Sequence, residues 1–352
     1  MRGRLLIPLA LVLLVLVALP LAALTETGVE DEVRGALGVE NVDCEPQTDE
    51  DSAWRQGPPL PFDLDEPRAA TVGGQIYLAG GITDVRQVSD VKLLLDPSDQ
   101  FHRFDPRSGT YEELAPVPRP LNHMAVVAHD GGVYVIGGYG ESLDEGTSSG
   151  FYRYDVAGGR WSRLPDLPRP LAAMAAGVVG ERLIVAGGAR DSVPVSDAYA
   201  FDFASRRWST LPDIPGPREH VGSVGLGGRL YVLGGRTPKS FAVKTAESYD
   251  VAARRWVSLP PMPVGSGGLG VVSVRGRPVA VAGGNDLAET VTGAVQELAP
   301  DGTWEELPSL RTPRHGHATA VADGKIWVFG GSPCAYFNAT DDVEWLPLTA
   351  AR

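Results

Sequence analysis

A short apolar segment that ends in two glycines occurs six times in the chain, and it constrains the fold more than any other feature. The copies read IYLAGG, VYVIGG, LIVAGG, LYVLGG, VAVAGG and IWVFGG. Their second glycines lie 57, 50, 47, 49 and 47 residues apart, at Gly81, Gly138, Gly188, Gly235, Gly284 and Gly331. A repeat of this length is typical of a β-propeller, in which each repeat builds one blade.

A second signature lies between the doublets: an aromatic residue followed by Asp, with another aromatic residue seven positions after the first. It occurs as Phe104-Asp105 with Tyr111, Tyr154-Asp155 with Trp161, Phe201-Asp202 with Trp208, and Tyr249-Asp250 with Trp256. The fifth repeat is degenerate, since Leu298 lies six residues before Trp304. Each repeat therefore predicts four strands: strand a is small and apolar, b ends in Gly-Gly, c ends at the aromatic-Asp pair, and d begins at the Trp.

The residue types suit these positions. Six inner strands converge on the axis of a propeller, so strand a has room only for small side chains such as Ala, Gly, Ser and Val. Glycine allows backbone turns and close approaches that a Cβ would prevent. Large aromatic side chains fill the space between twisted sheets, which widens outward.

The doublets, the Tyr-Asp pairs and the Trp-x-x-Leu-Pro segments together resemble those of the kelch-repeat family. The Trp-x-x-Leu-Pro segments begin at Trp161, Trp208, Trp256 and Trp304. The resemblance covers residues 54–352 and implies an all-β, six-bladed propeller with four antiparallel strands per blade. Because such a fold hosts unrelated functions, the function has to be argued from the residues at its two faces.

The sixth repeat predicts how the ring closes. After IWVFGG the chain supplies only one more strand, DDVEWLPL, so the last blade lacks a strand d. At the other end of the chain, Trp54 precedes the first strand a. We therefore expect an N-terminal strand at Trp54 to complete the sixth blade, which removes the open edge between first and last blades.

The N-terminal region predicts export. Residues 5–24 carry no charge and follow Arg2 and Arg4, and twenty apolar residues are enough to span a bilayer as a helix. Residues 1–24 are thus either an uncleaved membrane anchor or a cleaved signal peptide, and in both cases the remainder of the chain is extracytoplasmic. Ten acidic residues and one arginine follow within residues 25–53, which predicts an acidic, mobile tether.

The charge of the chain argues against nucleic acid as a partner. The formal net charge is −13, and the acidic tether contributes most of it. The propeller region has no basic stripe of the kind that phosphate backbones require.

One face of the predicted propeller is rich in arginine and other polar residues. In an up-and-down sheet the d–a and b–c connections lie at the same end, which we call the d–a/b–c face. The resemblance to ligand-binding kelch proteins implies binding at this face, and the candidate residues on it are Arg119, His123, Arg169, Arg190, Arg218, His220, Arg236, Asn285, Asp286, Arg314 and His317. Residues 263–270 contain no Arg or His, which predicts a gap bordered by Asn285 and Asp286.

Two interpretations of the arginines stay open. Five of them, if they converge around the mouth of the channel, would bind a carboxylate on a protein or a small acidic ligand: Arg119, Arg169, Arg218, Arg236 and Arg314. Alternatively each guanidinium ties a d–a loop to neighbouring carbonyls. Arg68 lies only thirteen residues before Gly81 and fits this pattern poorly.

The histidines raise the question of a metal. His123, His220 and His317 belong to blades two, four and six, so a three-histidine site is conceivable. Their distances to the second glycine are 15, 15 and 14 residues, which do not place them at one common level. No supporting carboxylate is evident either, so we interpret these histidines as structural and expect no metal and no cofactor.

Catalytic readings have less support than binding. Copper oxidases related to galactose oxidase resemble this chain in fold, but it has no Tyr-His dipeptide and its two cysteines lie near its ends. A carbohydrate-processing enzyme resembling a sialic acid mutarotase or epimerase is the alternative, because arginine suits a substrate carboxylate. The favoured reading is an exported module that binds a protein or an acidic ligand.

The two cysteines predict a disulfide. Cys44 lies ten residues before Trp54 and Cys334 three residues after Gly331, so both belong near the closing blade. In an exported chain such a pair favours a Cys44–Cys334 bridge, with two free thiols as the alternative.

Overall fold

A computed structural model describes residues 46–89, 92–140, 146–285, 290–334 and 338–349, and the statements below concern those residues. The predicted anchor or signal segment 1–24, most of the tether, Cys44 and Asp286 lie outside them. Within the described ranges, no helix is long and apolar enough to cross a membrane.

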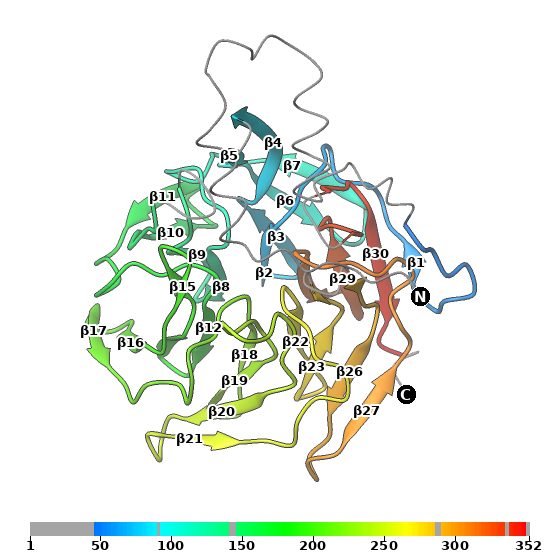
Figure 1. Cartoon of the computed structure of the whole chain (residues 1–352). Coiled ribbons are helices and arrows are strands. Elements are labelled where there is room, and N and C mark those ends of the chain that lie inside the picture. Colours follow the sequence, from blue (N-terminus) through cyan, green and yellow to red (C-terminus); the bar gives the residue numbers. More distant parts are fainter. Residues whose placement is uncertain (1–45, 90–91, 141–145, 286–289, 335–337, 350–352) are drawn as a thin grey trace, which may run out of the picture. The chain divides into compact units, whose positions relative to one another are not determined.

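Six four-stranded antiparallel sheets surround a central axis as the blades of a propeller (Figure 1). In strand order a to d, blade 1 consists of β2 (Arg68–Val72), β3 (Gln75–Ala79), β6 (Phe101–Asp105) and β7 (Thr110–Glu113); blade 2 of β8 (Ala125–His129), β9 (Gly132–Ile136), β10 (Phe151–Asp155) and β11 (Arg160–Arg163); blade 3 of β12 (Ala175–Val179), β13 (Arg182–Ala186), β16 (Ala198–Asp202) and β17 (Arg207–Thr210); blade 4 of β18 (Gly222–Leu226), β19 (Arg229–Leu233), β20 (Ala246–Asp250) and β21 (Arg255–Ser258); blade 5 of β22 (Gly270–Val274), β23 (Arg277–Val281), β26 (Val295–Leu298) and β27 (Trp304–Leu307); and blade 6 of β28 (Ala318–Ala322), β29 (Lys325–Phe329), β30 (Val343–Pro347) and β1 (Arg55–Gln56). The predicted all-β, six-bladed architecture is confirmed.

The ring closes as the sequence predicts. β1 pairs antiparallel with β30, with Arg55 opposite Trp345 and Gln56 opposite Glu344. Trp54, directly before β1, is 2% exposed and packs with residues of blades 5 and 6. The N-terminal strand therefore supplies the missing strand d of blade 6.

One repeated hydrogen bond explains the Trp-x-x-Leu-Pro segments. In every blade the aromatic residue of strand d donates a hydrogen bond to a backbone carbonyl of the preceding blade, and this carbonyl lies four residues after the aromatic residue there. The six bonds are 2.8–3.0 Å long and run from Trp54 to Pro308, Tyr111 to Pro58, Trp161 to Ala115, Trp208 to Pro165, Trp256 to Pro212 and Trp304 to Pro260. Each segment thus supplies both a donor and an acceptor to its neighbours.

The doublets occupy positions where a side chain would collide with the next blade. Gly137 has a φ of 63°, and a Cβ there would lie 2.2 Å from the carbonyl oxygen of Leu171. Gly138 donates its N–H to the same oxygen at 2.9 Å. A larger residue would force blades 2 and 3 apart.

Blade 5 corrects the assignment of one doublet. There the two positive φ values of the doublet fall on Ala282 (56°) and Gly283 (114°), and Gly283 donates to the carbonyl of Arg314 in the next blade at 2.9 Å. The doublet of this blade is therefore Ala282-Gly283, one residue earlier than the sequence pattern indicates. Gly284 already belongs to a hairpin strand.

The hydrophobic core lies between adjacent blades. Phe151 of blade 2 meets Phe201 of blade 3 edge to face, with ring centroids 5.0 Å apart, and Phe104 of blade 1 meets Trp327 of blade 6 in the same way.

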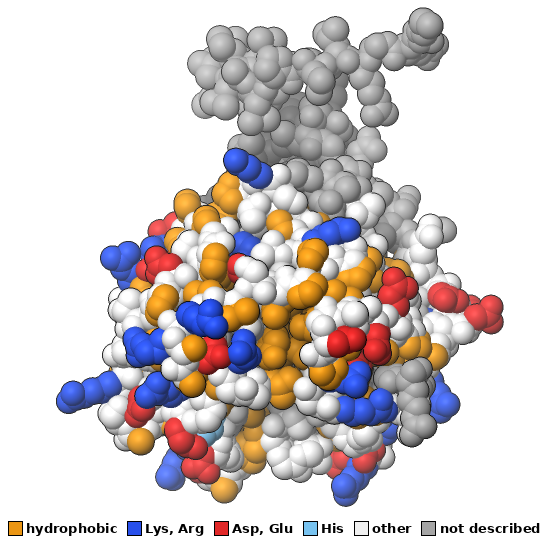
Figure 2. Space-filling model, turned by 90° about the horizontal axis from the view of Figure 1, so that it is seen from below, with side chains coloured by type: hydrophobic (Ala, Val, Ile, Leu, Met, Phe, Trp, Pro, Cys, Tyr) orange, Lys and Arg blue, Asp and Glu red, His pale blue; other side chains and the backbone are white. Residues whose placement is uncertain are grey.

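On the side of the molecule seen in Figure 2, Lys and Arg side chains are interspersed with Asp and Glu side chains, and apolar side chains gather between them.

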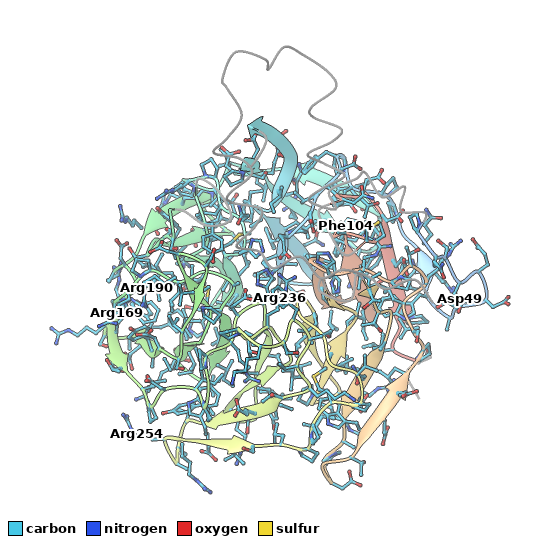
Figure 3. All side chains as sticks on the ribbon, in the orientation of Figure 1. Asp49, Phe104, Arg169, Arg190, Arg236 and Arg254 are labelled. Carbon is cyan, nitrogen blue, oxygen red and sulfur yellow. The ribbon has the colours of Figure 1, made fainter. Side chains whose placement is uncertain are left out.

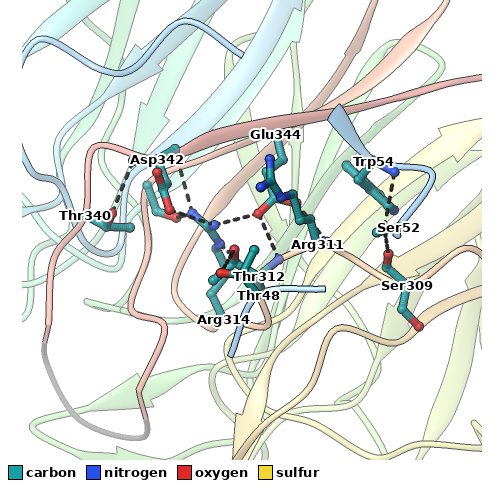
Figure 4. A network of polar contacts seen from close by, with 11 residues as sticks. Thr48, Ser52, Trp54, Ser309, Arg311, Thr312, Arg314, Thr340, Asp342 and Glu344 are labelled. Atoms are coloured by element: carbon teal, nitrogen blue, oxygen red, sulfur yellow. Dashed lines mark hydrogen bonds and ion pairs between the residues drawn. The ribbon is translucent and has the colours of Figure 1, made fainter. Parts of the chain in front are cut away.

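The last residues of the predicted tether contact the propeller. Asp49 donates its backbone N–H to the carbonyl of Arg311 at 2.9 Å. Ser52 Oγ donates to the carbonyl of Ser309 at 2.7 Å (Figure 4). Glu50 forms an ion pair with Arg311. Residues 46–53 are thus held on the blade 5 to blade 6 connection, because that loop offers carbonyls and an arginine to an acidic segment.

Candidate binding face

The two faces of the propeller differ in the length of their connections. The a–b turns are two residues long, as between Val72 and Gln75, and the c–d turns are also short. The opposite, d–a/b–c face carries all the long connections, including three two-stranded hairpins: β4 (Ile82–Ser89) with β5 (Lys92–Pro97), β14 (Ala189–Arg190) with β15 (Val193–Pro194), and β24 (Gly284–Asn285) with β25 (Thr290–Val291). Long loops on a rigid scaffold are where proteins carry binding residues.

Two of the five predicted mouth arginines are instead buried ties within their own blades. Arg218 is 3% exposed and pairs with Glu247 on strand c at 2.6 Å. Arg314 is fully buried and pairs with Glu344 on strand c at 2.7 Å. Neither guanidinium is available to a ligand, so for these two residues the alternative interpretation as loop ties holds.

Arg314 forms more polar contacts than Arg218. Its guanidinium also donates to the carbonyl of Thr312 at 3.1 Å (Figure 4). A further hydrogen bond joins it to the carbonyl of Gly330 at 3.2 Å. Glu344 accepts the backbone N–H groups of Arg311 and Thr312 at 2.8 and 3.0 Å. Burial raises the pKa of Glu344 although Arg314 and these N–H groups act in the opposite direction.

Two other arginines of the d–a/b–c face lie over blade 3 and reach a shared carboxylate. Arg190 lies 3.1 Å and Arg169 3.8 Å from Asp197, and the two are labelled close together in Figure 3. The Arg169 side chain is 64% exposed. Burial would raise the pKa of Asp197, but the hydrogen bonds from Tyr199 and Arg190 keep it below its usual value.

Arg119 and Arg236 take two further positions on this face. The Arg119 guanidinium packs on Gly140, where a Cβ would lie 2.5 Å from Arg119 Nε. Arg236 lies near the axis (Figure 3), with its guanidinium 5.8 Å from the ring centroid of Phe241. Gly267 leaves room for it, because a Cβ there would lie 2.7 Å from Arg236 Cγ.

The tip of the β14–β15 hairpin presents an apolar side chain beside the arginines. Val193 is 63% exposed and is the one large apolar side chain that the described part of the chain leaves exposed. Asp191 and Ser192 have φ values of 46° and 60°, which fit a tight two-residue hairpin turn. Thr147 Oγ1 accepts the N–H of Asp191 at 2.9 Å, which ties this hairpin to the b–c connection of blade 2.

A ring of six equivalent residues surrounds the axis on the same face. Each lies fifteen residues before the second glycine of its blade, and each has a φ between 50° and 65°: Glu66, His123, Ala173, His220, Gly268 and Gly316. We call these residues the axial ring. His317 follows Gly316 by one residue, so it lies off this level, and Glu66 occupies the level instead.

The polar members of the axial ring are buried together. Glu66 pairs with Arg68 at 2.8 Å and lies 3.6 Å from His123 Nε2, and the His123 and His220 rings are 4.6 Å apart between centroids. Burial would raise the pKa of Glu66, but His123 and Arg68 hold it at about 2. Burial also lowers the pKa of His123 to about 4 and that of His220 well below its usual value.

Two buried neighbours complete this cluster. Burial and the charge of Glu66 raise the pKa of Asp65 well above its usual value. His317 Nδ1 bonds Thr319 Oγ1 at 2.9 Å, and burial lowers the pKa of His317 to about 3. The sequence patterns pointed to neither Asp65 nor Glu66.

The remaining predicted positions are only partly described. Asn285 lies in β24, and Asp286 lies outside the described residues. The predicted disulfide involves Cys44, which also lies outside them, so the bridge stays a prediction.

Comparison with protein families identifies the repeats. The family model described as the KLHDC2/KLHL20/DRC7 Kelch-repeats domain matches residues 66–284 and 122–331. The chain belongs to the Kelch-repeat family. Among curated proteins, it is similar to Kelch-like protein terF of Aspergillus terreus, with 34% identity over 82 residues, and to Kelch repeat and BTB domain-containing protein 12 of Danio rerio, with 31% identity over 99 residues.

These similarities are local. They cover 23% and 27% of this Kelch chain and only 16% and 15% of the two relatives. They support the repeat architecture. Most of the length of each relative lies outside the aligned part.

The central channel of the Kelch propeller has a volume of about 380 Å³ and is lined mostly by the small and aliphatic residues of the six strands a. Arg68 and His317 also line it. Its lining, within the described residues, includes no Phe, Tyr or Trp on which a sugar ring could stack. The channel therefore gives no support to the carbohydrate-processing alternative.

Proposed function

We propose that the chain is an exported Kelch propeller that binds an acidic segment of a protein partner on its d–a/b–c face. The observation that carries the proposal is the concentration of long connections on this one face, where an exposed arginine, Arg169, occurs together with an exposed apolar hairpin tip, Val193. The opposite face has only short turns.

The sector over blades 2 and 3 suits a protein partner. Arg169, whose side chain is 64% exposed, offers guanidinium donors that match carboxylates, and Val193 at the hairpin tip offers an apolar contact. Protein interfaces commonly combine arginine with buried apolar anchors. The hydrogen bonds between Thr147 and Asp191 hold the hairpin in place, which reduces the entropy lost on binding.

Substitutions in this sector are expected to weaken binding without destabilising the fold. Arg169→Glu and Val193→Asp should each lower the affinity for the partner about tenfold or more, because one reverses an exposed charge and the other places a charge in the apolar contact. The measurement is capture of the partner from the extracytoplasmic fraction by the immobilised chain, followed by titration of the captured protein.

Arg254→Glu is the matched control, because Arg254 lies in the c–d turn of blade 4 on the opposite face. It reverses an arginine charge without touching the sector, so binding should equal that of the unaltered chain. Equal loss in the control, or full binding by both sector variants, would refute the assignment of this face.

Export predicts the state of the two cysteines. If residues 1–24 direct the chain out of the cytoplasm, Cys44 and Cys334 should form a disulfide in the oxidising compartment. Peptide mapping of the native protein without reductant should recover one cross-linked peptide pair that separates on reduction. Recovery of both cysteines as alkylated free thiols from the exported protein would contradict the bridge.

A further inference from the structure

The axial ring combines three side chains that bind metals with three positions that carry almost no side chain. Glu66, His123 and His220 come from blades 1, 2 and 4, and one potential ligand atom of each lies within 4.8 Å of the others. At the equivalent positions blades 3, 5 and 6 have Ala173, Gly268 and Gly316. A Cβ at Gly316 would be 2.8 Å from Glu66 Oε1, so glycine there leaves space for the carboxylate.

Both histidines have a neighbouring oxygen atom beside Nδ1. His123 Nδ1 is 2.8 Å from Asn122 Oδ1, and His220 Nδ1 contacts Glu219 Oε2. Because an amide oxygen and a carboxylate accept hydrogen bonds, these neighbours favour the tautomer with the proton on Nδ1, which leaves a lone pair on Nε2. Metal-binding histidines are held in this way by a carboxylate or carbonyl on the other nitrogen.

No hydrogen bond joins His123 to Glu66. His123 is 1% exposed, and its Nε2 has no hydrogen-bond partner among the described residues. It faces Glu66 Oε1 at 3.6 Å, so a nitrogen lone pair and a carboxylate oxygen point at one another in a buried site. A cation between the two atoms satisfies both.

The surrounding charges can accommodate a divalent ion. Arg68 holds Glu66 Oε2 at 2.8 Å, which leaves Oε1 as a single ligand atom. Glu219 brings a second carboxyl group to the cluster, where the guanidinium groups of Arg68 and Arg236 also lie. Tetrahedral zinc ligands lie about 3.4 Å apart, as bond lengths near 2.1 Å require, so side-chain shifts of about 1 Å suffice.

We propose that Glu66, His123 and His220 bind one first-row divalent cation of the zinc class at the axis of the propeller. Asn122 and Glu219 orient the two imidazoles. Three protein ligands leave at least one coordination position open. This site replaces the interpretation of His123 and His220 as purely structural, and it does not depend on the proposed protein partner.

Metal titration of the full chain tests the site. After dialysis against a chelator, the chain should bind one equivalent of Zn²⁺ by calorimetry, and Co²⁺ should give the visible absorption of a four- or five-coordinate ion. His220→Ala should abolish the stoichiometric binding. Glu219→Gln should weaken it about 10–100-fold, as expected for a residue that orients a ligand.

His129→Ala is the control, because His129 ends β8 on the opposite face and pairs with Glu181 there. It should bind Zn²⁺ like the unaltered chain. Ala at position 220 is compatible with folding, since Ala173 has the same φ in blade 3, and the melting temperature in chelator checks this. Zinc bound equally by His220→Ala, or no zinc bound by the unaltered chain, would overturn the proposal.

Discussion

Arg314→Ala is expected to lower the free energy of unfolding by about 3–5 kcal/mol, because removing one partner of a buried pair leaves the other charge uncompensated. Glu344 is that other charge, at 3% exposure and 2.7 Å from Arg314. Arg169→Ala, by contrast, removes an exposed side chain and should change stability by less than about 0.5 kcal/mol. Denaturant unfolding of the two variants measures both effects.

The pH dependence of the Arg314→Ala variant identifies the cause. Burial already raises the pKa of Glu344, and loss of the guanidinium raises it further. The folded variant then binds more protons than the unfolded chain between the unfolded and folded pKa values, so its stability falls as pH rises through this window. The destabilisation should therefore shrink between pH 8 and pH 5.

A second substitution provides the control for Arg314→Ala. Glu344→Gln removes the unpaired charge but keeps an oxygen that can accept the N–H groups of Arg311 and Thr312. The double variant should be more stable than Arg314→Ala alone at neutral pH. Equal stability of the two, or a pH-independent loss, would show that the pair does not tie the loop as described.

The sequence distinguishes buried from exposed arginines only when distances to the doublet are compared. Arg218 and Arg314 lie seventeen residues before the second glycine of their blades, and Leu64, Leu121 and Leu171 lie at the same distance in theirs. Those leucines are buried. An arginine at this position therefore enters the blade, but its carboxylate partner on strand c cannot be recognised from the repeat pattern.

The same comparison finds the axial ring, but one irregular blade obscures it. Counting fifteen residues back from Gly81 reaches Glu66 in blade 1. In blade 5 the count reaches Gly268 only if Gly283, and not Gly284, is taken as the second glycine. Ala282 has a φ of 56°, a conformation uncommon for alanine, so the sequence favours Gly283-Gly284 as the doublet. The blade count and the closing strand were predictable because the residues that form the hydrogen bonds between blades, the doublets and the strand-d aromatic residues, recur in the sequence of each repeat.

Trp54→Ala is expected to cost about 3–5 kcal/mol of stability, the usual range for deleting a buried aromatic side chain. Trp54 is 2% exposed, packs with residues of blades 5 and 6, and donates its indole N–H to Pro308 at 2.8 Å. The adjoining strand β1 has only two residues, which form few ladder bonds with β30. The side chain therefore holds the closing strand more than the backbone does, and thermal unfolding measures the loss.

The distribution of hydrogen-exchange rates over the blades distinguishes local opening of the ring from general destabilisation of the core. If Trp54 holds the ring shut, hydrogen exchange in Trp54→Ala should accelerate most at β30 and little at β20, because blade 6 opens before the remaining blades unfold. Trp54→Phe keeps most of the packing and loses only the hydrogen bond, so it should cost about 1 kcal/mol. Uniform acceleration in all six blades would mean that the ring opens and unfolds as one unit, since the closing strand would then have no separate role.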